Sequence, residues 1–482
     1  MCRARFVIIV LLGCQALPGV ALAQAAAERF IAAVKSGDAK EARRLVEAGG
    51  IAVDSRDDTG ATPLHWAAHA GDDQAVALLL RAGADPNATN RYGVTPLALA
   101  CASGNAKAVE SLLAAGADAN RASPEGETPL MVAARVGVMD SVTSLLRHGA
   151  NVDAREGWLG QTALMWAAAE NQAGVVGPLV AAGAKVNARS NSGFTPLVFA
   201  VRAGHAEAVE ALIEAGADVN LTLPDGTSPL LVSVINAHYE LAVRLLEHGA
   251  DPNAAAPGWT ALHQLVWTRR PNRYYGNPPA LPDGSVTDLD LVKALVARGA
   301  NVNARETKEP RDGNRSHLNR KGATPFLLAA KAVDLELMRL LLSLGANPLL
   351  ATEEGDTPLL VAAGVGIWSA SESPGSSEEA IEAVKLMIQL GDSVTAVDAN
   401  GDAALHGAVM RDSKELVLLL LDHGAALNPV DKLGWTPLTI TQGVFYGNLA
   451  RRFPEMETVL LKLGATSPAE HEACDVPCKA IP

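Results

Sequence analysis

The stretch DDTGATPLHWAAHAGDDQAVALLLRAGADPNA, residues 57–88, decides the fold, because its parts correspond one by one to the elements of a short helix pair. Thr62 suits the N-cap of a first helix and Pro63 its first turn. Gly71 ends this helix, as glycine does just past a helix C-terminus. A second, leucine-rich helix ends at Gly83, and a polar turn follows. One such pair cannot bury its own apolar face, so it must stack on copies of itself.

Copies of this unit recur along almost the whole chain. The motif Thr-Pro-Leu, with relaxed variants, begins at Thr62, Thr95, Thr128, Thr162, Thr195, Ser228, Thr260, Thr324, Thr357, Ala403 and Thr436. Counted from each motif to the next, the spacings are 33, 33, 34, 33, 33, 32, 64, 33, 46 and 33. A Gly-Ala marker follows the motif at a constant distance in the regular repeats, at Gly83, Gly116, Gly216 and Gly249. A period of this length is the signature of a repeat solenoid.

The unit resembles the ankyrin repeat, whose consensus carries Thr-Pro-Leu-His, a mid-repeat Ala-Ala-x-x-Gly and a closing Gly-Ala-Asp-x-Asn. Residues 62–65 and 83–87 match that pattern, and the resemblance extends over about residues 25–466. It implies an all-α repeat solenoid of about twelve helix-turn-helix repeats with short hairpin fingers. In this family the first helices and the fingers line a concave groove. Some exported bacterial ankyrin proteins also share the Trp-Thr-Arg-Arg-Pro run and a segment like Gly364–Trp368.

Several residues that could suggest chemistry have a structural explanation in this pattern. His65, His263 and His406 occupy the fourth motif position, where the family uses histidine to brace the turn. The closing Asp/Asn segments lack the bidentate acid of a calcium loop. The inserted loops contain no nucleophile–base pair, metal-ligand spacing or phosphate loop. We therefore expect no enzymatic activity, no catalytic residues, no metal and no cofactor.

The N-terminus predicts export. Residues 1–23 combine two arginines, an apolar run and the small-x-small sequence Ala21-Leu22-Ala23, which is typical of a cleaved signal peptide. The alternative is a lipobox at residues 11–14, which would leave a lipidated Cys14 and is the one route to a membrane. Either way we expect an exported protein, periplasmic or secreted. The solenoid would then span residues 24–466, and residues 467–482 would form a C-terminal tail.

Charge limits the class of partner. The formal net charge is −13, and loss of Arg3 and Arg5 with residues 1–23 would make it −15. Phosphate binding needs a basic surface, so nucleic acid is not expected as the main partner.

Export would place the cysteines in an oxidising environment, where disulfides can form. Cys101 lies in an apolar helical context and is expected to be a buried thiol. Cys474 and Cys478 lie in the polar tail, where we expect a short local disulfide; two free thiols are the alternative. Together with His471 the two cysteines give three sulfur and nitrogen ligands, one fewer than a structural zinc site needs, so we expect no metal site here.

The repeat is interrupted only in its C-terminal half. About 18 extra residues separate the two helices of the repeat at Thr260, near 267–285. The finger at 305–321 carries about 13 extra residues, the repeat at Thr357 carries 13 near 367–380, and the repeat at Thr436 carries about 7 near 444–454. Three of these insertions occupy the same slot between first and second helix, in the seventh, ninth and eleventh motif-bearing repeats. Loops added to a rigid scaffold are where function usually resides.

The insertions concentrate aromatic residues and arginines, which are enriched at binding hot spots. We predict that the three inter-helix loops meet in one composite patch lined by Trp267, Tyr274, Tyr275, Trp368 and Tyr446, with Arg269 and Arg270 at its rim. The alternative is that these aromatics only pin the loops to the array edge. The enlarged finger has six basic residues against three acidic ones. Its Arg311 and Arg315 could bind an acidic partner segment, or the finger could simply be solvated.

These observations favour a non-enzymatic scaffold that binds another protein through the groove and the inserted loops. A host-directed effector would use the same mechanism on a foreign target, and the sequence does not separate the two. An enzyme with a site in the inserted loops is the third and least favoured class, since fold alone does not exclude it.

Overall fold

A computed structural model describes residues 18–270, 284–308, 318–367, 375–443, 445–446, 449–450 and 452–467. Over these residues the regular elements are 24 helices, one hairpin of two short strands and an isolated bridge between Val397 and Ala403. The chain divides into two compact units, Met1–Ala217 and Asp218–Pro482. Both units are built from consecutive helix pairs, so the expected all-α repeat solenoid is confirmed.

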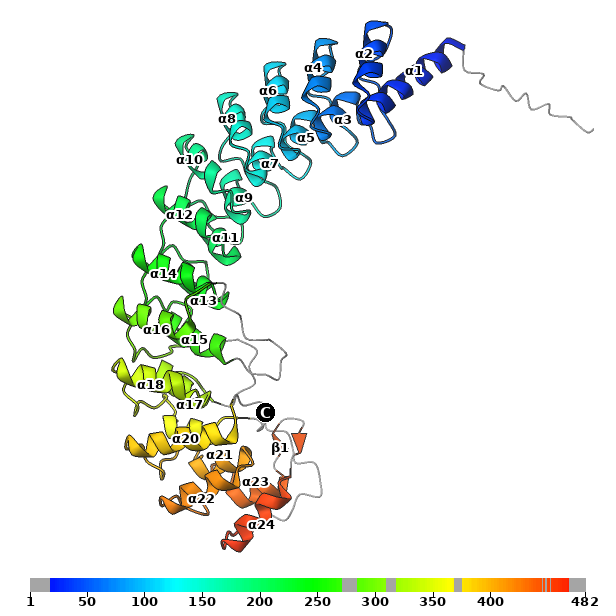
Figure 1. Cartoon of the computed structure of the whole chain (residues 1–482). Coiled ribbons are helices and arrows are strands. Elements are labelled where there is room, and N and C mark those ends of the chain that lie inside the picture. The colour runs from blue at the N-terminus through cyan, green and yellow to red at the C-terminus, as the bar shows by residue number, and fades with distance from the viewer. Residues whose placement is uncertain are drawn as a thin grey trace, which may run out of the picture. The chain divides into compact units, whose positions relative to one another are not determined.

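In the first unit, six helix pairs follow one another. First helices pack on first helices and second helices on second helices, which gives two parallel rows (Figure 1). The helices are α1 (Pro18–Lys35), α2 (Ala39–Glu47), α3 (Pro63–His69), α4 (Asp73–Arg81), α5 (Pro96–Ala102), α6 (Ala106–Ala114), α7 (Pro129–Val136), α8 (Met139–Arg147), α9 (Ala163–Ala169), α10 (Ala173–Ala181), α11 (Pro196–Ala203) and α12 (Ala206–Glu214).

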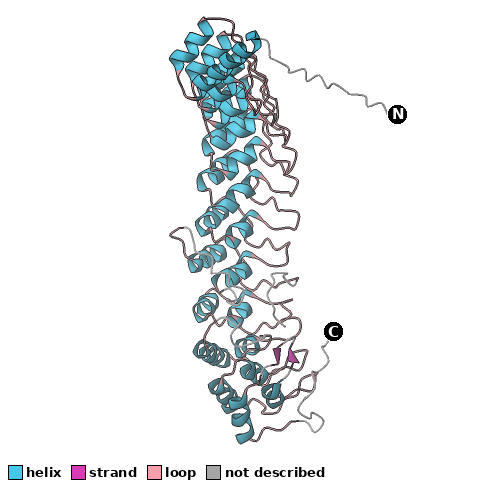
Figure 2. Ribbon diagram, turned by 90° about the vertical axis from the view of Figure 1, so that its right-hand side faces the viewer, coloured by secondary structure: helices cyan, strands magenta, loops and turns pink. Residues whose placement is uncertain are grey.

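The second unit repeats this arrangement, and the fingers project from its helix rows on one side (Figure 2). Its helices are α13 (Pro229–Ile235), α14 (Tyr239–Glu247), α15 (Ala261–Arg269), α16 (Asp288–Ala297), α17 (Pro325–Lys331), α18 (Leu335–Ser343), α19 (Pro358–Ala363), α20 (Ser377–Gln389), α21 (Ala404–Met410), α22 (Lys414–Asp422), α23 (Pro437–Gly443) and α24 (Pro454–Lys462). Between α23 and α24 the antiparallel strands β1 (Phe445–Tyr446) and β2 (Leu449–Ala450) form a hairpin that the repeat pattern does not predict.

The motif residues act as the pattern predicts. Thr62 is the N-cap of α3, Pro63 is its first residue, and Gly71 adopts a positive φ of 67° just past its end. His65 Nδ1 accepts the N–H of Thr62 at 3.1 Å, while its Nε2 lies 3.0 Å from the carbonyl oxygen of Val94 in the next finger. The expected bracing role of this histidine is confirmed, because one side chain joins a helix start to the neighbouring repeat.

Asparagine side chains join consecutive repeats through main-chain groups. Asn87 Nδ2 donates to the carbonyl of Gly116 at 2.9 Å, and its Oδ1 accepts the N–H of Asp118 at 2.8 Å. Asn253 makes the same pair of bonds with Gly299 and Asn301, at 2.9 and 2.7 Å. The first of these bonds spans 29 residues at Asn87 and 46 at Asn253, so the bond between consecutive repeats is kept across the insertion.

The second half of the N-terminal helix carries buried residues. Phe30, Ile31, Ala33 and Val34 are buried against the first repeats. The predicted cleavage point between Ala23 and Gln24 lies inside α1, upstream of all four. In the part of the chain that the structure covers, no helix has the length and apolar character needed to span a bilayer.

Candidate functional site

Three of the four insertions of the second unit, those near 267–285, 305–321 and 367–380, leave the array from a group of contacting segments. We call these segments the stems and define them as residues 267–270 and 284–288, 305–308 and 318–321, and 364–367 and 375–379. Each stem is the last described part of a repeat before its extra residues begin or the first part after they end. The positions of the stems therefore fix the points on the array where these insertions begin and end.

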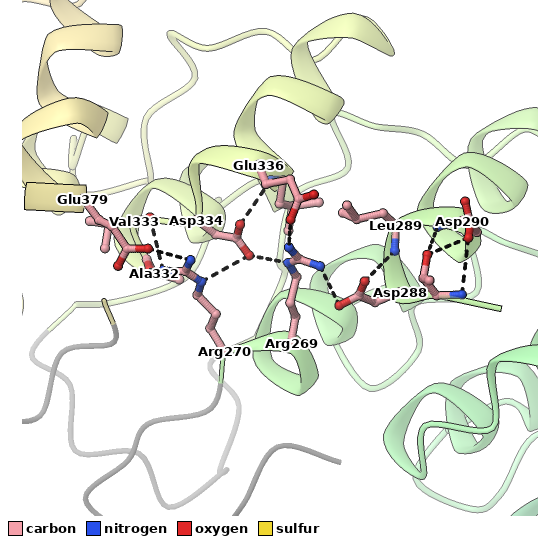
Figure 3. Close-up of polar contacts among 12 residues, drawn as sticks. Arg269, Arg270, Asp288, Leu289, Asp290, Ala332, Val333, Asp334, Glu336 and Glu379 are labelled. Carbon is pink, nitrogen blue, oxygen red and sulfur yellow. Dashed lines mark hydrogen bonds and ion pairs between the residues drawn. The ribbon is translucent and has the colours of Figure 1, made fainter. Parts of the chain in front are cut away.

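Arg269, the last residue of α15, binds carboxylates of two other helices (Figure 3). Its Nη1 lies 2.6 Å from Asp288 Oδ2 and its Nε lies 2.6 Å from Asp334 Oδ2. Its Nη2 pairs with Glu336. Burial alone would lower the pKa of Arg269, but Asp334 and Asp288 raise it above its ordinary value. The guanidinium is thus a permanent positive centre, with only 16% of the side chain exposed.

Arg270 extends the same cluster to the next repeat (Figure 3). Its Nε lies 3.5 Å from Asp334 Oδ2, and its Nη2 lies 2.9 Å from Glu379 Oε1. Its Nη1 donates to the carbonyl of Val333 at 3.4 Å. Val333 has a φ of 46°, which is unusual for a β-branched residue, so this bond supports a strained turn. Arg270 therefore links the first stem of the loop after α15 to the start of α20.

The acidic partners of these arginines stand at helix N-termini. Asp288 is the first residue of α16, Asp334 is the N-cap of α18, and Glu379 belongs to the capping box of α20. Carboxylates are favoured at such positions by free N–H groups and the helix dipole. Two adjacent arginines thus join the starts of three successive second helices.

The other end of this loop is also fixed. Ser285 donates through its backbone N–H and its Oγ to Glu240 Oε1 on α14, at 2.7 and 2.8 Å. These two bonds lower the pKa of Glu240. Both ends of the insertion after α15 are therefore bound to neighbouring repeats.

The base of the enlarged finger is a buried ion pair. Arg320 Nη2 lies 3.0 Å from Glu306 Oε1, and the two side chains are 7% and 0% exposed. The guanidinium of Arg320 also lies 3.6 Å above the ring of Trp267, which itself packs on Trp259 at a centroid distance of 5.6 Å. The finger and the loop after α15 thus start from one packed unit.

A third contact brings in the loop after α19. Gly366 has a φ of 80°, and a Cβ built on it would stand 2.8 Å from the Cβ of Leu318. Only glycine allows the two backbones to approach this closely. The stem of this loop therefore packs directly on the stem of the finger.

The predicted site residues fall into two groups. Trp267, Arg269 and Arg270 are placed and have the partners described above. The packing of Trp267 agrees with the alternative that aromatics pin the loops, and the two arginines, which were expected at the rim of a binding patch, make ion pairs within the array. Tyr446 lies in β1. The other predicted binding residues lie outside the described residues: Tyr274, Tyr275, Arg311, Arg315 and Trp368. The tail cysteines Cys474 and Cys478 and the lipobox residue Cys14 also lie outside them. Binding roles for all these residues stay predictions.

The acidic partners were not singled out from the sequence. Asp334 occupies the same N-cap position as Asp72 and Ser413 in other repeats, so its residue type carried no distinguishing signal. Arg320 and Trp267 belong to different repeats, and no local pattern relates them.

A second cluster lies at the finger bases of the last repeats. Burial and the neighbouring carboxylates of Asp398, Asp431 and Asp356 raise the pKa of Asp402 to about 7. Burial also raises the pKa of Asp356 to about 6, against a hydrogen bond from Thr352. A cavity of about 50 Å³ adjoins these groups. Among the residues placed by the structure, no group of three or more His, Cys, Asp or Glu could hold a metal ion.

Comparison with known proteins supplies the family. A model described as "Ankyrin repeats (3 copies)" matches residues 30–123, 97–190, 130–223, 179–256, 197–272 and 374–443, and one described as "Ankyrin repeat" matches 321–353. The chain belongs to the ankyrin repeat family. Between and after the matches, 273–320, 354–373 and 444–482 are left out. These stretches contain most of the insertions near 267–285 and 305–321, half of the one near 367–380 and all of the one near 444–454. Ankyrin repeats identify the chain as a scaffold for contacts with other proteins.

Three curated relatives match short parts of the chain. Protein phosphatase 1 regulatory subunit 27 of Homo sapiens and of Mus musculus are each 36% identical over 89 residues, which is 18% of this chain and 53% of theirs. The calmodulin-binding transcription activator CBT of Oryza sativa subsp. japonica is 50% identical over 44 residues, or 9% of this chain and 5% of its own. The chain thus spans about half the length of the first two relatives.

Proposed function

We propose that this protein is an exported, non-enzymatic scaffold whose insertion-bearing repeats bind another protein. The observation that carries the proposal is the mutual contact of three stems. Arg270 pairs with Glu379, Arg320 lies on Trp267, and Leu318 packs on Gly366. Three insertions that are far apart in sequence therefore start from one rigid base.

A rigid base favours binding because it reduces the entropy lost on association. The insertions on this base then supply the hot-spot residue types Tyr274, Tyr275 and Trp368, with Arg311 and Arg315 as cations for an acidic segment. Tyr446 comes from the fourth insertion, outside these stems. The relative named as a phosphatase regulatory subunit is, by that name, a protein that acts on another protein. The proposed mode of action for this chain is of the same kind, with a different and unidentified partner.

The proposal of export rests on the sequence of residues 1–23, and the N-terminal helix is compatible with it. Cleavage after Ala23 would remove none of the buried residues Phe30, Ile31, Ala33 and Val34. Intact-mass measurement of the exported protein should give a chain that begins at Gln24. A diacylated chain beginning at Cys14 would contradict this and place the protein on a membrane.

Binding is tested with the whole protein as bait in an envelope extract, followed by affinity measurement with the purified partner. The variant Tyr274→Ala with Tyr275→Ala should weaken binding about 30-fold, as truncation of a hot spot does. Its melting temperature should stay within about 1 °C of the parent value if the two tyrosines serve the partner and not the array, since changes away from core contacts have small effects on stability. Lys462→Ala, an exposed change on α24, is the matched control and should alter neither.

The reverse result has a clear meaning. If the double variant melts earlier and binds as tightly as the parent protein, the two tyrosines serve the array and the proposed contact is wrong.

A further inference from the structure

The finger between α8 and α9 is one residue longer than its neighbours. Thr128 and Thr162 lie one position further apart than the motif pairs on either side of them. In ordinary fingers a capping residue closes the turn; Asn90 Oδ1, for example, accepts the N–H groups of Tyr92 and Val94 at 2.9 and 3.0 Å. The longer finger must close its turn differently.

The hydrogen bonds between fingers identify the extra residue. Gly157 N donates to the carbonyl of Glu125, the second residue after the capping residue Ser123. The next bond along, from Asn191 N, goes to Leu159, which is the third residue after Glu156. Trp158 is therefore the inserted residue, pushed out of the regular series.

Glu156 holds this longer tip in one conformation. Its carboxylate accepts the N–H groups of Trp158, Leu159 and Gln161 at 2.6, 2.7 and 2.9 Å. The residue is only 8% exposed. Burial would raise the pKa of Glu156, but the N–H groups, that of Gln161 first, lower it. A glutamate stands here where the neighbouring fingers have the shorter Asp57, Asn90, Ser123 and Ser190, and its extra length spans the extra residue.

The side chain of Trp158 is displayed to solvent although its backbone is fully bonded. Its carbonyl accepts Asn191 Nδ2 at 3.0 Å, yet 85% of the residue is exposed, beside Leu159 at 46%. Trp66, by contrast, donates its Nε1–H to Asp57 and lies under Lys35. Within the described residues the indole of Trp158 has no ring contact and no hydrogen bond.

We propose that Trp158, with Leu159, is a contact point for a folded protein partner, separate from the inserted loops. The indole would enter an apolar slot that offers an acceptor for its N–H, because a buried indole N–H needs one. The slot would have an acidic rim, since the guanidinium of Arg155 lies against the tip and binds the carbonyl of Arg189, while the charge of Glu156 is taken up by N–H groups. Tryptophan is the residue type most enriched at binding hot spots, and a pre-ordered tip reduces the entropy cost. The inference rests on the proposed scaffold function but not on the insertions.

The test uses the full chain in its native cell, with the photo-reactive residue p-benzoylphenylalanine at position 158 or, as control, at Ser192, an exposed position on the next finger. Position 158 should give a defined adduct that position 192 does not give. Mass spectrometry should place the cross-link in an apolar slot with carboxylates at its rim. No specific adduct, or a slot without carboxylates, would overturn the proposal.

The affinity of variants for the purified partner then shows whether Trp158 contributes to binding or is only exposed to solvent. Trp158→Ala should bind at least about 30-fold more weakly with an unchanged melting temperature, and Trp158→Phe should lose less than about 10-fold. Glu156→Ala should weaken binding although Trp158 is retained, and Glu156→Gln should restore part of it. Arg155→Ala should reduce the salt dependence of binding. Parent-like affinity of Trp158→Ala or of Glu156→Ala overturns the inference.

The two proposals fail in different ways. If Trp158→Ala binds normally and the Tyr274/Tyr275 variant does not, this inference is wrong and the proposed role of the insertions stands. The opposite pattern removes the role of the insertions and leaves the fingertip contact.

Discussion

The Nε of Arg269 lies 2.6 Å from the Oδ2 of Asp334, a residue 65 positions further along the chain. Asp334 is 1% exposed, and its other oxygen caps α18 by accepting the N–H of Leu337 at 3.2 Å. One carboxylate therefore both starts a helix and fixes the end of α15. This double use explains why the loop after α15 can be long without loosening the array.

Replacing Arg269 by Met should destabilise the region around α16 and α18. Asp334 would stay buried with Arg270, at 3.5 Å, as its remaining cation, and breaking a buried pair costs about 3 kcal/mol. Hydrogen exchange should show faster amide exchange in these two helices. Arg339→Met, an exposed change on α18, should leave exchange unchanged, and an equal response to both variants would contradict the assigned role.

The aspartate cluster at the last finger bases predicts a pH dependence of stability. The pKa of Asp402 is about 7 in the folded protein, against an ordinary value of 3.8. The folded state then binds more protons than the unfolded state between these values, so stability falls as pH rises from about 4 to 7. The melting temperature of the second unit should be higher at pH 5.5 than at pH 8. Asp402→Asn should raise it at pH 8 and flatten the profile, whereas the exposed change Asp422→Asn should do neither.

Replacement of Arg411 by an apolar residue should stabilise the folded protein. It is 6% exposed, and in the part of the chain that the structure describes its Nε and Nη2 have no hydrogen-bond partner. Burial lowers its pKa to about 10, which still leaves it charged at neutral pH. Arg411→Met should raise the free energy of unfolding by about 1–4 kcal/mol, measured by urea titration. A loss of stability would mean that the guanidinium has a partner.

Cys101 should be inert in the folded protein. It is fully buried, and burial raises the pKa of its thiol to about 12. At pH 8 the thiolate fraction is then about 10⁻⁴, and the thiolate is the reactive form. Iodoacetamide should label Cys101 only in urea. Labelling of the native protein within minutes would show that α5 opens far more readily than its burial suggests.

The tail cysteines should form a disulfide after export. Alkylation of Cys474 and Cys478 is expected only after reduction, and the parent protein should contain two reducible thiols. The variant with Cys474→Ser should then show one alkylatable thiol without reduction. Free labelling of both cysteines in oxidised parent protein would contradict the pairing.

The sequence predicts the local parts of this fold well. Thr62, Pro63 and His65 act within one helix start, so their spacing alone indicates the turn and its brace. The insertions were found because they lengthen a fixed period, and Asn253 shows that the array closes behind the first of them.

The contacts that tie the stems together were beyond such a prediction. Arg269–Asp334 and Arg320–Trp267 join residues from different repeats. Other repeats have similar capping and finger residues at the corresponding positions, so the residue types alone do not reveal these contacts. The unusual finger that carries Trp158 could have been predicted from the sequence. The one lengthened spacing among the first five motif intervals marks its finger, but only the hydrogen bonds between fingers identify which residue is the extra one.

The asparagine bridges have a consequence for how such a protein can change. Asn253 recognises only main-chain atoms of Gly299 and Asn301, so it is indifferent to the composition and length of the segment that separates it from Gly299. The segment between α15 and α16 is therefore a suitable place for loop grafting. A recognition loop from another protein could replace the present one there, while the repeats on either side keep their packing.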